Sequence, residues 1–344
     1  MKEIIEKAEK LREIGNFRES LSLWKKIYKA SLKKSNPSLI LDCLIAIGDL
    51  LRIRGQFKKS EHFYSEALEL ATALEDWLSY ADAVVGIALS KKATGHWKEA
   101  LKMVREARKI YENIRDRKGI AFTFWAEGVS WRFGGRAKKS IDSFNKALLM
   151  FKRLKDEKAI GYTFCGLGGS WRIYGDFAKS MDYYKKANEI FKKIGDKFGL
   201  AYSFCGIGNA YRMVRNLKEG EKSFNKALKL YDEIGDIVSS SYTLWSMAMV
   251  KILQAENSNN IMFQMAEDYI KKAERNFQKC SDLRGKAYCK LLKGMIMYLK
   301  KRKQLSKIYF HEALKICERF DFSLEKKYAE KFIDGLLPIP YNIP

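Results

Sequence analysis

A period of forty residues runs through most of this chain and limits what it can fold into. Glycine, aspartate and alanine each return at this interval. The three series are Gly15, Gly55, Gly95, Gly135 and Gly175; Asp76, Asp116, Asp156, Asp196 and Asp236; and Ala67, Ala107, Ala147, Ala187 and Ala227. A fixed period of this length indicates a solenoid, in which copies of one small supersecondary unit stack on each other.

Each unit is predicted to consist of two antiparallel helices. The chain has no proline between residues 38 and 337, and proline would break helix interiors. Asp196 is predicted to cap a helix over 197–214, because an N-cap carboxylate accepts hydrogen bonds from the first free N–H groups. Gly175 is predicted to end the helix before it in the left-handed conformation. A second helix is predicted over 177–194, and the short loops make the two helices antiparallel.

The unit GYTFCGLGGSWRIYGDFAKSMDYYKKANEIF resembles a tetratricopeptide repeat. That family has a large residue at position 4, Leu–Gly at 7 and 8, an aromatic at 11, a small residue at 20, an aromatic at 24 and alanine at 27. The corresponding residues are Phe164, Leu167, Gly168, Trp171, Ser180, Tyr184 and Ala187. The unit of forty residues is longer than the usual thirty-four, and the proline that usually ends the repeat is absent.

The resemblance implies an all-α fold, a right-handed α-solenoid of about eight stacked helix-turn-helix repeats in one domain over 1–335. The repeats are expected to begin at residues 1, 41, 81, 121, 161, 201, 241 and 287. The seventh carries a six-residue insertion near 255–260, predicted to be a polar loop. A helix from about 323 to 333 is predicted to cap the array. Residues 336–344 then form an apolar, proline-rich tail.

Most of the repeated pattern is expected to serve packing, with small residues that allow helices to approach closely. Positions 2, 5, 9 and 12 of the first helix share one face, which in tetratricopeptide proteins lines a concave groove for an extended peptide. Position 12 is basic in six units, Arg12, Arg52, Lys92, Arg132, Arg172 and Arg212. The predicted groove also contains Phe122, Tyr162, Tyr202, Tyr242, Trp125, Trp245 and Asn209. Gly169 and Cys165 are expected to leave room there for a bulky ligand group.

Arginine beside aromatic rings suits an elongated ligand that carries several negative charges and apolar groups. The predicted function is a non-enzymatic interaction scaffold whose groove binds an acidic or carboxylate-bearing segment of a partner protein. Asn209 would bond the backbone of that segment, as the asparagine near this place does in peptide-binding members of the family. Two alternatives remain open: binding of RNA or another polyanion, and self-association in which the tail docks in a neighbour's groove or in its own. The basic column also fits a solvated or ion-paired ridge, and the tyrosines fit packing between repeats.

Composition bounds the remaining function classes. The formal net charge is +24, from 65 Lys+Arg against 41 Asp+Glu, which attracts acidic partners and also keeps a protein dispersed. No catalytic motif, metal-ligand spacing or cofactor fingerprint occurs, so no enzyme, metal or cofactor is predicted. The six cysteines show no disulfide framework and suit a reducing, cytoplasmic location. No apolar run is long enough for membrane insertion.

Overall fold

The computed structural model describes residues 1–255 and 260–344, and these residues form seventeen helices and no strand. The first helices of the eight repeats are α1 (Lys2–Glu13), α3 (Pro37–Ile53), α5 (Trp77–Ala93), α7 (Arg117–Phe133), α9 (Glu157–Tyr174), α11 (Lys197–Met213), α13 (Ile237–Gln254) and α15 (Leu283–Leu299). The second helices are α2 (Phe17–Lys33), α4 (Phe57–Ala73), α6 (Trp97–Asn113), α8 (Ala137–Arg153), α10 (Phe177–Ile194), α12 (Leu217–Ile234), α14 (Asn260–Lys279) and α16 (Lys303–Arg319). Helix α17 (Ser323–Ile333) follows them as the predicted cap. The all-α solenoid is confirmed, while residues 256–259 of the predicted insertion lie outside the described residues.

The periodic aspartates and glycines mark the helix ends as predicted. The side chain of Asp196 accepts a hydrogen bond from the backbone N–H of Gly199 at 2.9 Å, which caps α11. The equivalent aspartates cap α5, α7, α9, α13 and α15 in the same way. Gly175 has a φ of 105°, in the left-handed region, at the end of α9. Arg215, which replaces glycine in the sixth unit, keeps this conformation with a φ of 63°.

Three of the aromatic residues at position 24 each pack between two glycines of neighbouring first helices, namely Tyr64, Phe144 and Tyr184. Tyr184 on α10 is 3% exposed. A Cβ atom added to Gly168 on α9 would lie 2.8 Å from its ring, and one added to Gly206 on α11 would overlap the same ring. Glycine at both positions therefore allows α9 and α11 to close around the aromatic side chain, which explains why the pattern of small residues recurs.

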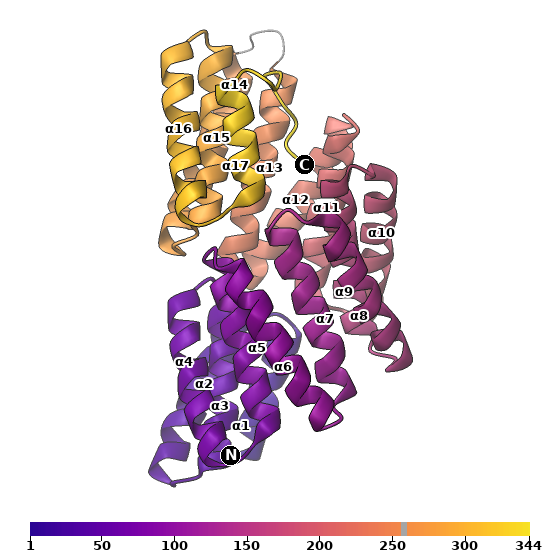
Figure 1. Ribbon diagram of the computed structural model, residues 1–344, viewed down its shortest axis with the longest axis vertical. Coiled ribbons are helices and arrows are strands. Elements are labelled where there is room, and N and C mark those ends of the chain that lie inside the picture. Colours follow the sequence, from indigo (N-terminus) through magenta and orange to yellow (C-terminus); the bar gives the residue numbers. More distant parts are fainter. Residues whose placement is uncertain (256–259) are drawn as a thin grey trace.

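The early and the late repeats meet each other in the folded chain (Figure 1). Helices α13–α17 lie beyond one end of helices α3–α6 in this view, and helices α7–α12, which come between the two groups in sequence, lie on the right. The indole N–H of Trp97 on α6 donates to the backbone carbonyl of Asp321 at 3.0 Å. The rings of Phe133 on α7 and Phe322 are 6.0 Å apart. We call this contact between the early repeats and residues 320–325 the seam.

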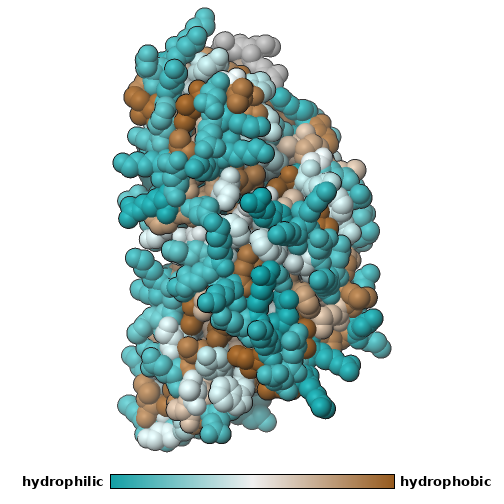
Figure 2. Space-filling view, in the orientation of Figure 1, coloured by the Kyte–Doolittle hydropathy of each residue, from teal (hydrophilic) through white to brown (hydrophobic). Residues whose placement is uncertain are grey.

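The surface is mostly hydrophilic on the face shown in Figure 2, with small apolar areas between charged side chains. Within the described part of the chain, no helix combines the length and apolar character that a membrane crossing requires.

Candidate functional site

Predicted groove residues from different repeats contact each other. Arg132 on α7 donates to the hydroxyl of Tyr202 on α11 at 3.4 Å, although one repeat lies between these helices. A contact of this kind is possible only where side chains of successive repeats converge. We define the inner surface as the six basic residues of position 12 with the aromatic residues and Asn209 predicted beside them. Five of the six basic residues are partly exposed, and Arg212 is buried.

The first two cations of the inner surface are neutralised by one carboxylate. Asp49 accepts from Arg12 at 2.7 Å and from Arg52 at 3.0 Å. The hydroxyl of Tyr64 also donates to Asp49 at 2.7 Å. Although burial opposes ionisation, the two guanidinium groups hold the pKa of Asp49 below its usual value. This end of the inner surface is an ion-paired structural cluster, which is the alternative that the sequence left open.

The middle of the inner surface has a different electrostatic character. Lys92, Arg132 and Arg172 form no ion pair with any described carboxylate, and the Nε atom of Arg172 is buried without a hydrogen-bond partner. The ammonium of Lys92 lies 5.2 Å from the ring centre of Phe133. Burial, and then the nearby cations Arg132, Arg52 and Arg284, lower the pKa of Lys92 to about 7. Three partly buried cations without counter-ions make this surface a site that favours an anion.

The structure leaves no open space beside Gly169 for a ligand group. A Cβ atom added to Gly169 would overlap the guanidinium of Arg132 and lie 3.1 Å from the hydroxyl of Tyr184. The glycine therefore makes space for a side chain of the protein itself, and the expectation of a pocket for a bulky ligand group there is wrong. Cys165 likewise is buried in the packing of α9 and α10.

The aromatic residues of the inner surface pack inside the protein or bond the aspartates that cap helices, more than they offer contacts to a ligand. The ring of Tyr162 lies 4.8 Å from that of Phe191, and its hydroxyl donates to Asp196 at 2.9 Å. Tyr242 repeats this arrangement with Phe277 at 4.8 Å and Asp282 at 3.0 Å. Phe122 and Trp125 stack on each other at 5.5 Å, and Tyr202 stacks on Phe198 at 6.4 Å. These side chains remain partly exposed, and each contacts another aromatic ring of the protein.

Arg212, Asn209 and Trp245 form a buried group with the tail, which we take as residues 336–344. Asn209 accepts from the Nη2 atom of Arg212 at 2.9 Å, and its own amide donates to the carbonyl of Cys205 at 3.1 Å. The indole of Trp245 donates to the carbonyl of Tyr288 at 3.1 Å. Asn209 therefore positions Arg212, and its predicted bond to a ligand backbone would require these contacts to change.

Several residues that shape this region were not found by sequence reasoning. They are Asp49, Arg284, Glu325, Asn342 and Ile343. Asp49 occupies position 9 of the second repeat, which is one of the groove positions, whereas Arg284 lies outside these positions and the other three lie beyond the last repeat. Two signals were therefore present in the sequence: the groove position of Asp49, and the apolar tail, whose sequence suggested that it docks in a groove.

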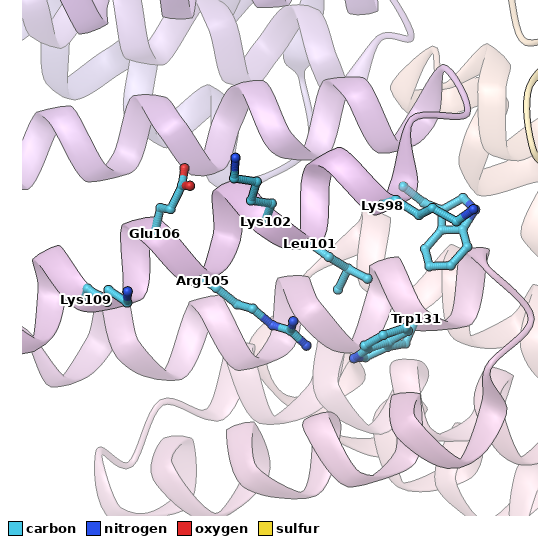
Figure 3. Close-up of a pocket in the computed structure, with 8 residues that line it drawn as sticks. Lys98, Leu101, Lys102, Arg105, Glu106, Lys109 and Trp131 are labelled. Atoms are coloured by element: carbon cyan, nitrogen blue, oxygen red, sulfur yellow. The ribbon is translucent and has the colours of Figure 1, made fainter.

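A second candidate site lies along α6 (Figure 3). This pocket has a volume of about 560 Å³ and is lined by Trp97, Lys98, Leu101, Lys102, Arg105, Glu106, Lys109 and Trp131. Lys98 pairs with Asp321 at 2.7 Å, and Arg105 pairs with Glu127 at 2.8 Å. Two of the four cations that line the pocket thus form ion pairs within the protein. The pocket therefore offers less unpaired charge than the inner surface.

No metal or nucleophilic chemistry is evident in the described residues. They contain no group of three or more His, Cys, Asp or Glu side chains able to hold a metal ion. All six cysteines are free thiols. Burial raises the pKa of the Cys165 thiol, and that of Cys205, above the usual value. Neither thiol is therefore activated as a nucleophile.

Comparison with known proteins agrees with this geometry. Residues 39–113 match the family model described as tetratricopeptide repeat, and no curated protein matches the sequence. A Rap protein complexed with competence and sporulation factor has a similar fold, with a TM-score of 0.65 at 12% identity over 98% of both chains. Cut9 of the Cut9–Hcn1 hetero-tetramer of the APC/C matches with a TM-score of 0.63 at 14% identity, over 95% of this chain and 55% of that chain.

A third similar structure is aspartyl phosphate phosphatase F from Bacillus subtilis, with a TM-score of 0.53 at 13% identity, over 97% of this chain and 93% of the other. At these identities the likeness extends to the fold and not to an activity. Residues 39–113 therefore match the tetratricopeptide repeat, and eight helix pairs of the same construction continue this fold through the described residues.

Proposed function

We propose that this chain is a protein-interaction scaffold whose inner surface binds an extended, acidic segment of a partner protein. The observation that supports the proposal is the group of Lys92, Arg132 and Arg172, which are partly buried and lack a carboxylate partner among the described residues. Burying a cation without a counter-ion is unfavourable. A carboxylate-bearing ligand would supply the missing counter-charge, and arginine can hold it through paired hydrogen bonds.

The shape of the ligand follows from the spacing of these cations. They come from α5, α7 and α9, which are neighbouring first helices, and such helices lie about 10 Å apart. Carboxylates on an extended peptide fit this separation when two residues lie between them, because the chain advances roughly 3.3 Å per residue. The net charge of +24 adds a long-range attraction for acidic partners.

A peptide fits this surface better than a nucleic acid does. Non-specific binding of single-stranded nucleic acid relies on exposed aromatic faces on which bases stack. The rings of Tyr162 and Tyr242 instead lie against Phe191 and Phe277. Two proteins of similar fold are described in complexes, the Rap protein with competence and sporulation factor and Cut9 with Hcn1. They illustrate that this architecture can hold another molecule.

The test is a titration with a fluorescein-labelled decapeptide that contains aspartate at every third position and isoleucine or tyrosine between. We expect the double variant Arg132→Gln, Arg172→Gln to bind it at least tenfold more weakly than the wild type. A hydrogen bond to a charged group contributes about 1.5–3 kcal/mol, so the loss of two such bonds exceeds that factor. Fluorescence anisotropy measures the dissociation constants, and circular dichroism checks that the variant is folded.

A matched control removes the same charge from the pocket along α6, which we call the outer pocket. Lys102→Gln with Lys109→Gln also lowers the net charge by two, and both lysines are exposed. We expect less than a twofold change in peptide affinity for this control, because exposed charges are screened by salt. Equal weakening by both double variants would contradict the proposal and indicate general attraction to positive charge. Tight, steeply salt-dependent binding of a mixed-sequence RNA would favour the polyanion alternative.

A further inference from the structure

The tail returns from α17 to the inner surface of its own chain. In Figure 1 it descends from the end of α17 and finishes beside α12 and α13. Ile343 is 0% exposed and belongs to the hydrophobic core formed by α13–α17. The ring of Tyr341 lies 5.9 Å from Tyr328 and 6.2 Å from Phe332, both on α17. The tail thus packs against its own chain, which is one of the two placements that its sequence suggested.

The tail ends in contacts with Arg212 that resemble those of a bound peptide. The Nη2 atom of Arg212 donates to the backbone carbonyl of Ile343 at 2.9 Å, and its Nη1 atom donates to the side-chain oxygen of Asn342. The amide of Asn342 donates in return to the backbone carbonyl of Arg212 at 2.8 Å. One asparagine therefore pairs with both the side chain and the main chain of the same arginine.

Arg212 is fully buried, yet the groups that accept its hydrogen bonds are neutral. Burial, and then the nearby cation Arg172, lower its pKa to about 9. The neighbouring Arg172 has a buried Nε atom without a partner. A fully buried cation beside a second unsatisfied cation is a poor match for an uncharged tail. A carboxylate in the place of the Asn342 amide would supply the counter-charge that the buried guanidinium lacks and could accept two parallel hydrogen bonds from it. We expect this gain to exceed the loss of the hydrogen bond that the amide donates to the carbonyl of Arg212.

We propose that the tail is an intramolecular ligand, and that a partner segment with aspartate followed by isoleucine, leucine or valine displaces it from Arg212. The aspartate takes the place of Asn342 on the guanidinium, and the branched residue fills the apolar position of Ile343. This inference rests on the proposed function and names the chemistry of the segment that this end of the inner surface binds. Because the tail is tethered, it competes at a high effective concentration, and only a segment that binds better than the tail opens the site.

The test uses two fluorescein-labelled peptides with the sequence of residues 336–344, one native and one with aspartate in place of Asn342. They are titrated against the whole chain and against a chain shortened after Gly335. We expect both peptides to bind the shortened chain at least tenfold more tightly than the whole chain. We also expect the aspartate peptide to bind the shortened chain about tenfold more tightly than the native peptide. Equal affinity of the two chains for these peptides would overturn the proposal.

A second variant keeps the proposal testable if the shortened chain is poorly folded. Asn342→Asp in the whole chain places a carboxylate on the tethered tail itself. The tail then competes more strongly for Arg212, so we expect this variant to bind the aspartate peptide about tenfold more weakly. Glu330→Gln, an exposed change on α17, is the control and should leave binding unchanged. Unchanged or tighter binding to Asn342→Asp would contradict the proposal. A concentration-dependent dimer of the whole chain that the shortening abolishes would place the tail in a second copy and also overturn it.

The failure of this inference is distinguishable from failure of the proposed function. If the acidic decapeptide binds through Arg132 and Arg172 but shortening the chain changes no affinity, the tail proposal fails alone. If the tail peptides bind the shortened chain as expected and the decapeptide does not bind at all, the proposed function fails and the site at Arg212 stands.

Discussion

Replacing Glu325 with alanine is expected to lower the free energy of unfolding by about 3–5 kcal/mol, because removing one partner of a buried ion pair leaves the other charge uncompensated. Glu325 is 0% exposed and accepts from the Nε and Nη2 atoms of Arg284 at 2.8 Å and 2.6 Å. The guanidinium of Arg284 also lies 4.0 Å from the ring centre of Phe133 on α7. The pair thus joins α15, α17 and α7 at the seam.

Urea denaturation followed by circular dichroism measures this effect. The variant Glu330→Ala changes an exposed glutamate on the same helix, whose ion pair with Lys326 is long, at 3.7 Å. Its expected cost is below about 0.5 kcal/mol, since exposed pairs contribute little. If both variants were equally stable, the seam would not depend on Arg284 and Glu325. We also expect the affinity of the Glu325→Ala variant for tail peptides to differ from that of the wild type, because the seam and the tail both contact α17.

The affinity for an acidic peptide is expected to fall about tenfold between pH 6 and pH 8 because of Lys92. Its pKa of about 7 in the free protein reflects burial and the cations Arg132, Arg52 and Arg284, against the opposing effect of Asp282. A bound carboxylate raises this pKa toward the usual value. The complex then holds a proton that the free protein has partly lost above pH 7, so binding takes up a proton and weakens as the pH rises. Below pH 6 Lys92 is mostly charged in both states, so it adds no further dependence of the affinity on pH.

Isothermal titration calorimetry in two buffers with different enthalpies of ionisation measures the proton taken up. The variant Lys92→Met should bind more weakly at pH 6 and show no change in affinity from pH 6 to pH 8. The variant Lys102→Met, on the outer pocket, should keep the wild-type dependence on pH. An unchanged slope in Lys92→Met would show that another group titrates.

The repeat architecture was predictable because local physics fixes it. Capping aspartates such as Asp196, left-handed glycines such as Gly175 and the paired glycines around Tyr184 act within one or two units. The requirement at each position is the same in every repeat, so it leaves a periodic trace in the sequence. The helix bounds over 177–194 and 323–333 agree with the structure for the same reason.

The contents of the candidate site were less predictable because they depend on the accumulated rotation of the solenoid. Trp97 meets Asp321 across 224 positions of sequence, and no local pattern encodes this distance. Asp49 pairs with Arg12 and Arg52, so a column that looks uniform in sequence is partly neutralised. Arg132 occupies the space above Gly169, since a long side chain can fill a gap that another repeat creates. The basic column was visible in the sequence, but which of its members lack counter-ions was not.

The most direct measurement of the central claim is photo-crosslinking of the acidic decapeptide, with benzoylphenylalanine in place of one tyrosine, to the unmodified protein. Mass spectrometry then identifies the attached residues. The account predicts crosslinks on α5, α7 and α9, next to Lys92, Arg132 and Arg172. Crosslinks confined to α6, around Lys102 and Lys109, would contradict it and place the binding site at the outer pocket.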